Sequence, residues 1–318
     1  MTLDAALVGY GPASAARQEA DNPMNTTITE TAGPRSTALL ADATRLGGVE
    51  LTVTDLDRAL GFYTRVIGLS VRERDGRSAA LHAGGEDLVM LRAEPGAHPA
   101  GRHAGLYHYA LLFPTREELA RVARRVAESR TRIDGASDHG THEAIYLPDP
   151  DGNGIELAAD RPREQWPDMS GGGDLFGAGP APLDLGALFA TIGDAAPTAL
   201  ADPGLRMGHI HLHVGELDAA TRFYRDGLGF ELKGTLPTAV FVSAGGYHHH
   251  VAFNTWRGAG VGPAPAGAVG LRHWTLITEN AAERDAVASR LTAQDVTLEQ
   301  RPDGTLARDP SGNAVLIR

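Results

Sequence analysis

A repeat inside the sequence constrains the fold more than any other feature. The stretch from Gly47 to Leu69 can be laid over the stretch from Gly208 to Phe230 without a gap, and nine of 23 positions are identical. Two shorter pairs follow in the same order: GLYHYALLF (105–113) with GLRHWTLIT (270–278), and DPDGNGIEL (149–157) with DPSGNAVLI (309–317). A repeat kept in order predicts two halves with the same architecture.

Each half switches between two hydrophobic periods in the same order. The first unit reads as a strand at 49–53, a helix at 57–67 and short strands at 69–75, 78–84 and 86–94. The second reads as a strand at 106–113, a helix at 116–129 and short strands that end at 154–160. The sequence therefore predicts an α+β protein of four βαβββ units, two in each duplicated half.

Glycine, proline and alanine mark the boundaries between the predicted parts. We expect one domain at 45–160 and a second at 205–318, which agrees with a length of 318 residues at roughly 150 residues per domain. Residues 1–40 are predicted to be a flexible extension. Residues 161–204 are predicted to be a connector that carries one short helix at 185–192.

Composition narrows the classes of function and of metal ligand. There are 40 acidic residues against 29 lysines and arginines, a formal net charge of −11, and no basic run follows a phosphate backbone, so nucleic acid is not expected as a partner. The chain has no run of about 18 apolar residues and no basic signal-peptide start, which predicts a cytoplasmic protein with no membrane partner. Because there is no cysteine, any metal site must use His, Asp or Glu.

Histidines gather at two places in the second half. In MGHIHLHV (207–214), strand alternation would put three histidines on one face: His209, His211 and His213. In YHHHVAFNTW (247–256), read as a strand that opens at Tyr247, His249 would project opposite to its two neighbours. A single strand histidine is more often a hydrogen-bonded core residue than a ligand, and a triplet could be a solvated strand end.

Two residues of the first half stand out against apolar neighbours. His108 lies in an otherwise apolar strand, and Glu156 lies inside the apolar run IEL, where a buried carboxylate needs a partner. Pairing of Glu156 with an arginine remains an alternative.

The two copies differ at these positions. His209 is matched by Gly48 and Glu156 by Leu316, and of the candidates outside the triplet only His108 keeps its counterpart, His273. The second and third units together therefore hold all of the candidate ligands, which suggests that one of two equivalent sites has been lost. Two imidazoles and one carboxylate match the facial triad of non-haem Fe(II) oxygenases.

At these motifs the chain resembles the vicinal oxygen chelate superfamily, which includes glyoxalase I, extradiol ring-cleaving dioxygenases and the fosfomycin- and bleomycin-resistance proteins. The resemblance covers about residues 45–318 and is carried by FYTRVIGL (62–69), DGLGF (226–230) and DPDGNGIEL. It implies cupped mixed sheets around a metal, with ligands on the first strand of one unit and on the first and last strands of its partner. Three residues match those places: His209, His108 and Glu156.

Four longer stretches resemble catechol-2,3-dioxygenase-like proteins: GHIHLHV, GGYHHHVAFNTW, SDHGTHEAIYLPDPDGNGIEL and ADRPREQW. In that family a histidine on the strand matching HHHVAF is the acid/base, and the best register implies His249, with a pKa near neutrality. The resemblance also implies a substrate-binding Tyr146, ten residues before Glu156, and a supporting His139. We assign four more residues to the ring-binding pocket: His211, His250, Asn254 and Trp256, the last with an ordinary core position as the alternative.

The activity implied is extradiol cleavage of catechol or a substituted catechol, a small aromatic diol, with Fe(II) and O2. Mn, Ni or Zn remain alternatives to iron, and a homo-oligomer is compatible with the family. Two other functions stay open. One is a glyoxalase-type lyase with a fourth protein ligand, and the other is a module that sequesters an aromatic drug without catalysis.

Overall fold

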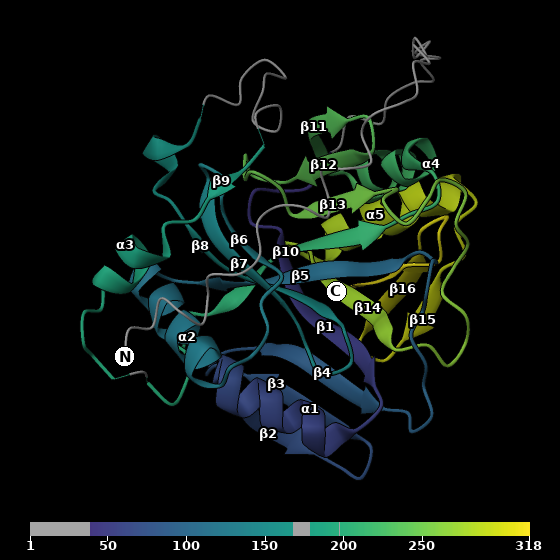
Figure 1. Ribbon diagram of the computed structural model, residues 1–318. Helices are drawn as coiled ribbons and strands as arrows, with labels where there is room; N and C mark the ends of the chain where they lie inside the picture. Colours follow the sequence, from purple (N-terminus) through teal and green to yellow (C-terminus); the bar gives the residue numbers. More distant parts are fainter. Residues whose placement is uncertain (1–38, 168–178, 197) are drawn as a thin grey trace.

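The computed structural model describes residues 39–167, 179–196 and 198–318, and these residues form two mixed β-sheets with few helices (Figure 1). The expected extension at 1–40 lies outside the described residues except for its last two. The prediction of an α+β fold with four βαβββ units is confirmed. In the described residues no helix has the length and apolar character needed to cross a membrane.

The first and fourth units share one sheet of eight strands, which we call the 1/4 sheet. Its strands, in spatial order, are β15 (Glu299–Arg301), β16 (Gly304–Arg308), β17 (Ala314–Ile317), β14 (Gly270–Ile277), β1 (Arg45–Val53), β4 (Asp87–Ala93), β3 (Ser78–His82) and β2 (Ser70–Arg74). The two units meet where β1 pairs antiparallel with β14. This sheet therefore joins the two ends of the described chain.

The second and third units share a sheet of nine strands, which we call the 2/3 sheet. Its order is β11 (Glu231–Leu236), β12 (Ala239–Ser243), β13 (Val251–Asn254), β10 (Arg206–His213), β5 (Gly105–Phe113), β8 (Gly154–Asp160), β7 (His142–Pro148), β6 (Gly135–Asp138) and β9 (Ala181–Pro182). Here β10 pairs antiparallel with β5. Each sheet thus takes one unit from each half of the chain.

Helices follow the first strand of every unit. Their bounds are α1 (Leu56–Phe62) with the π-helical turn η2 (Tyr63–Ile67), α2 (Arg116–Glu128), α4 (Leu217–Thr221) with η4 (Arg222–Leu228), and α5 (Ala281–Ala293). The connector adds the short turn η3 (Arg163–Gln165) and α3 (Leu185–Ala190), which confirms the helix expected there. Side chains cap the starts of α1, α2, α3 and α5, as when Thr115 accepts from the Glu118 amide.

Strand alternation separates the core from the site. On β10, Ile210 and Leu212 are fully buried in the main hydrophobic cluster, and so are Leu51 and Val53 on β1. Residues at the intervening positions of β10 point to the other face of the strand. The apolar positions therefore anchor each first strand and leave the opposite face free to carry polar groups.

The two superfamily motifs contact each other in both halves. The Tyr63 hydroxyl donates to Asp149 Oδ2 at 3.0 Å, and the Tyr224 hydroxyl donates to Asp309 Oδ2 at 2.9 Å. All four residues are buried, and each aspartate also accepts backbone N–H bonds within its own turn. Buried bonds to a carboxylate stabilise a fold by about 1.5–3 kcal/mol. These tyrosine–aspartate hydrogen bonds hold one unit to the next in each half.

One local prediction is wrong. The triplet His248 to His250 is not part of an extended strand, because β13 begins only at Val251. Gly245 and Gly246, with φ of +58° and +64°, turn the chain just before it. Side-chain alternation therefore does not apply to the triplet.

Candidate metal centre

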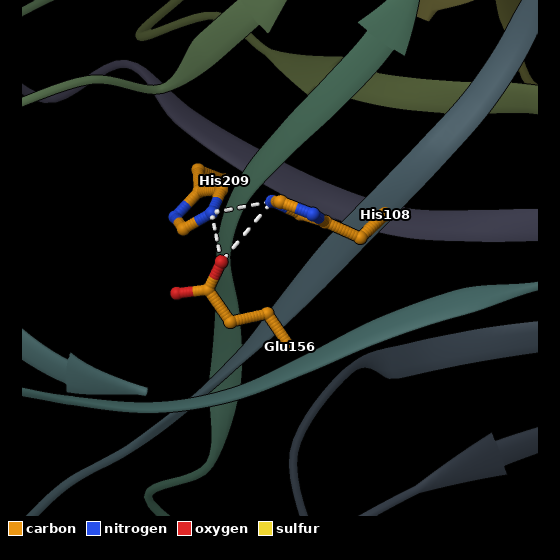
Figure 2. Close-up of side chains that lie close together, drawn as sticks. All are labelled: His108, Glu156 and His209. Atoms are coloured by element: carbon orange, nitrogen blue, oxygen red, sulfur yellow. Dashed lines mark hydrogen bonds and ion pairs between the residues drawn. The ribbon is translucent and has the colours of Figure 1, made fainter. Parts of the chain in front are cut away.

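Three neighbouring strands of the 2/3 sheet bring the predicted ligands together. His209 lies on β10, His108 on β5 and Glu156 on β8, and β5 runs between the other two. Figure 2 shows the three side chains pointing toward one another from these strands. Because each residue comes from a different strand, cross-strand register decides that they meet.

The ligand atoms converge at short distances. His209 Nε2 lies 3.3 Å from His108 Nε2 and 3.0 Å from Glu156 Oε2, and His108 Nε2 lies 3.1 Å from the same oxygen. Bonds of about 2.0–2.2 Å to one ion, set at right angles, would separate donor atoms by about 3.0 Å. Two imidazole nitrogens and one carboxylate oxygen are also a donor set typical of a divalent transition metal. The residues fit a metal ion of this kind.

Burial and charge set the protonation of the cluster. Glu156 is 1% exposed, and burial by itself would raise its pKa. The charge of His209 and hydrogen bonds from the surrounding imidazoles outweigh burial and hold the pKa of Glu156 well below its usual range. Burial lowers the pKa of His209 in turn. An ionised carboxylate and neutral imidazoles are the forms that bind metal.

The predicted acid/base His249 lies against this cluster. Its ring centroid is 4.2 Å from that of His209, and its Nδ1 lies 2.8 Å from Nδ1 of His248. The expected near-neutral pKa is not found, since burial lowers the pKa of His249 well below its usual 6.5. The ring is therefore neutral at physiological pH and can accept a proton.

Tyr146 and His139 form a second polar group beside the ligands. The Tyr146 hydroxyl lies 2.7 Å from His139 Nε2, and the Tyr146 ring packs 5.5 Å from the His108 ring. Burial, followed by the charge of Glu156, raises the pKa of Tyr146 well above its usual value. The tyrosine therefore stays protonated and can donate a hydrogen bond.

The predicted pocket residues lie on the other side of His108. Asn254 Nδ2 donates to His211 Nε2 at 2.8 Å, and the His211 ring contacts the rings of His108 and Trp256. Trp256 is 50% exposed, so it is not an ordinary core residue. These residues therefore lie beside one of the ligands, His108.

Sequence reasoning missed Tyr107, whose ring packs against the rings of His211 and Trp256. The register of β5 against β10 shifts at this residue, and the bulge turns Tyr107 toward the rings of His211 and Trp256. Bulges commonly redirect a side chain next to an active site. Strict alternation would have placed Tyr107 opposite to His108, so the sequence held no signal for it.

His142 was also missed, although a signal was present. Its Nε2 lies 3.1 Å from Glu156 Oε1, and its ring stacks between His139 and His248 at centroid distances of 4.5 and 4.6 Å. It is 3% exposed. His142 stands four residues before Tyr146 on β7, so strand alternation places both on one face.

The structure does not bring His250 to the other predicted residues. Its Nδ1 accepts from the Ala244 amide at 3.1 Å and lies 3.0 Å from Ser243 Oγ. Its ring lines a separate cavity of about 470 Å³ together with Tyr247 and Arg163. The reason is the bend at 247–250, which turns His250 away from His248 and His249.

Comparisons with known proteins agree with this architecture. The model of the Glyoxalase/Bleomycin resistance protein/Dioxygenase superfamily matches residues 45–157 and 206–317. A catechol-2,3-dioxygenase of Bacillus subtilis (strain 168) is 39% identical over 278 residues, which cover 86% of this chain and 96% of that protein.

Solved structures show the same fold at lower identity. A candidate dioxygenase from Bacillus subtilis subsp. subtilis str. 168 superposes with a TM-score of 0.61 at 14% identity, covering 88% of this chain and 86% of that one. Glyoxalase I from Zea mays gives a TM-score of 0.53 at 18% identity, with 86% and 92% covered. With two matched segments spanning both halves, and with a relative at 39% identity, the chain belongs to the glyoxalase, bleomycin resistance protein and dioxygenase superfamily.

Proposed function

We propose that this protein is an extradiol ring-cleaving dioxygenase that uses Fe(II) and O2 on catechol or a substituted catechol. The observation that carries the proposal is the buried cluster of two imidazoles and one carboxylate with His249 on one side and Tyr146 on another. The 39% identity to a protein named catechol-2,3-dioxygenase supports it.

His108, His209 and Glu156 would hold the ion, and they supply only three protein ligands. A three-ligand face leaves positions open for other groups. When bound there, Fe(II) would supply the redox chemistry that lets O2 react with the diol. The protein's own contribution is to orient the diol and to handle its protons.

His249 Nε2 is the atom suited to accept a proton from the diol. Its Nδ1 is engaged with His248, and the neutral ring packs against His209. A positioned general base of this kind contributes roughly 10²- to 10⁴-fold to a rate. His249 would take a hydroxyl proton as the diol binds and return it later in the reaction.

Tyr146 is suited to hold the diol in place. Because its hydroxyl stays protonated, it can donate a hydrogen bond to an ionised diol oxygen beside Glu156. His139 Nε2, 2.7 Å away, orients that hydroxyl. On the other side, the aromatic wall of Tyr107, His211 and Trp256 offers ring edges and faces against which an aromatic substrate can pack.

The two alternatives receive less support. A glyoxalase-type lyase would use a fourth protein ligand, but the ligand cluster found among the described residues has three members. The His249 ring packs against His209 but is not a member of that cluster. A module that only sequesters an aromatic drug would not need a buried metal-ligand set.

Oxygen uptake by the anaerobically purified, Fe(II)-reconstituted protein tests the proposal. We expect consumption of O2 and a yellow ring-opened product when catechol is added, and no consumption by His209→Ala. Firmly bound metal with no uptake across several catechols would favour the lyase. Failure to bind any metal would favour the sequestering module.

A further inference from the structure

Asp160 has no role in the site as described so far, yet it lies close to it. It is the last residue of β8 and stands four positions after Glu156, on the same face of the strand. Both of its carboxylate oxygens lie 3.1 Å from the Tyr247 hydroxyl, and Oδ1 lies 3.4 Å from His248 Nε2. Arg206 approaches the other oxygen at 3.9 Å.

His248 connects this carboxylate to the proposed acid/base. It is 1% exposed and uses its two ring nitrogens in two directions: Nε2 faces Asp160, and Nδ1 lies 2.8 Å from Nδ1 of His249. The ring is fixed by stacking on His142, with centroids 4.6 Å apart and planes 10° apart. Asp160, His248 and His249 therefore form a single line of hydrogen bonds.

Counting donors along this line fixes the position of each proton. Both oxygens of Asp160 accept from the Tyr247 hydroxyl, as those of an ionised carboxylate do, and in that form Asp160 can only accept from His248 Nε2. A neutral imidazole carries one N–H, so His248 Nδ1 accepts, and His249 Nδ1 must be the donor. His249 Nε2 is left with its lone pair.

We propose that Asp160 is a positioning residue that acts through His248 to hold His249 in the tautomer whose Nε2 is unprotonated. The inference rests on the proposed function only in taking His249 as the acid/base. Without the carboxylate, the pair of facing Nδ1 atoms could share its proton in either direction, and half of the arrangements would place the proton on the wrong nitrogen of His249.

The 1/4 sheet shows that the fold does not require this line. In the register of the two sheets, Val251 beside Ile210 corresponds to Val89 beside Val49. The counterparts of His248 and His249 are thus Glu86 and Asp87, which form exposed ion pairs with arginines.

The test is the ¹⁵N spectrum of the full-length, histidine-labelled protein, as purified and with Zn²⁺ added. Ring ¹⁵N shifts distinguish a protonated from an unprotonated nitrogen, and His249→Phe identifies the signals of His249. We expect an unprotonated Nε2 in the wild type. In Asp160→Ala, the signals should move toward a mixture of tautomers, and kcat for catechol should fall by roughly 10- to 100-fold, as for other outer partners, with little change in KM.

Tyr247→Phe is the matched control, because it also removes the Tyr247 to Asp160 hydrogen bond but leaves the carboxylate beside His248. Its His249 signals should match the wild type. A wild-type His249 protonated at Nε2 would overturn the proposal, whether or not Asp160→Ala folds. So would unchanged signals in Asp160→Ala, or an equal change in Tyr247→Phe. The spectrum needs no turnover, so a protein that fails to cleave catechol would refute the proposed function and leave this inference standing.

Discussion

The 2/3 sheet and the 1/4 sheet are built from equivalent units, pair their first strands antiparallel and share a register shift at the same place. That shift falls at Tyr107 in one and at Arg272 in the other. In the 2/3 sheet it turns an aromatic ring toward the ligand cluster. In the 1/4 sheet it turns a guanidinium toward Glu50, at 3.5 Å. The framework is common to both sheets, and the side chains on it differ.

Main-chain packing shows why the 1/4 sheet lacks a metal centre. A Cβ at Gly48, the counterpart of His209, would lie 2.5 Å from the Asp87 carbonyl oxygen and 2.9 Å from that of Leu88. The counterpart of Glu156 is the buried Leu316. His273 remains, but it bonds Glu50 at 3.2 Å. The 1/4 sheet keeps the same fold without these ligands, because the tyrosine–aspartate hydrogen bonds that hold the units together do not involve the ligand side chains.

The largest expected effect comes from giving the 2/3 sheet the residue of its counterpart. Glu156→Leu removes the only carboxylate of the ligand cluster, so metal content should fall to background and activity by more than the roughly 100-fold that loss of an outer partner costs. Metal analysis measures the metal content, and oxygen uptake measures the activity. His273→Ala in the 1/4 sheet is the control and should leave both unchanged. Full metal occupancy in Glu156→Leu would contradict the assignment.

His249→Phe should separate metal binding from proton transfer. The ring of His249 packs on His209 without joining the ligand cluster, so metal content should stay at the wild-type level. Turnover should fall by about 10²- to 10⁴-fold, the usual contribution of a general base. Metal analysis and steady-state rates on one preparation decide this, and full activity would remove the proton-transfer role.

Gly48→His should fail to restore a second metal centre. Its side chain would press on the backbone of Asp87 and Leu88, so we expect a loss of about 3 kcal/mol, at the upper end of overpacking costs. Urea unfolding and metal stoichiometry measure the two effects. Gly76→Ala, where a Cβ meets nothing within 4 Å, should change stability by less than about 0.5 kcal/mol. A second equivalent of bound metal would show that the backbone at Asp87 and Leu88 can move to make room for the new side chain.

Tyr63→Phe should cost more than Tyr224→Phe. Each change removes one buried hydrogen bond of 2.9–3.0 Å to an aspartate, but Tyr63 also accepts from the buried Tyr109 hydroxyl at 2.9 Å, which would lose that partner. We expect about 1.5 kcal/mol for Tyr224→Phe and about 1 kcal/mol more for Tyr63→Phe in urea unfolding. Equal losses, within experimental error, would mean that the Tyr109 hydroxyl finds another partner.

Glu50→Gln should cause the smallest loss of stability. The loss should show as a change in how stability depends on pH. Burial would raise the pKa of Glu50, but the hydrogen bond and charge of His273, with Arg272 and Arg92, leave it below the usual 4.5. A lowered carboxyl pKa stabilises the fold above that value, and the contribution is lost as pH falls through the lowered pKa. Free energies of unfolding in urea at about pH 3 and about pH 6 should differ less in Glu50→Gln than in the wild type, by an amount under about 1 kcal/mol. An unchanged difference would mean that Glu50 is not ionised in this cluster.

Short-range patterns were enough for much of the fold. Alternation at 207–214 and 106–113 identified β10 and β5, and helical spacing at 116–129 identified α2. The absence of cysteine drew attention to histidine and to acidic residues. The apolar neighbours of His108 and Glu156 and the loss of Glu156 and His209 from the other copy then selected these three residues, which the structure brings within hydrogen-bonding distance. These signals are local, because side-chain direction follows from a period of two or 3.6 residues.

Other site features depend on contacts that the periodicity within one strand does not predict. The bulge at Tyr107 depends on how β5 pairs with β10, and the bend that places His248 beside His249 depends on the turn at Gly245 and Gly246. His142 reaches Glu156 only because β7 lies beside β8.

The sequence by itself determined the duplication, the α+β class, the helices and strands, and the residues that could bind a metal. Only the tertiary structure decided which unit faces which, where the register shifts, and which imidazoles converge around Glu156. The physical reason is that periodicity constrains a strand or helix within itself. A site built across β10, β5, β8 and β7 depends on hydrogen bonds between segments far apart in the chain.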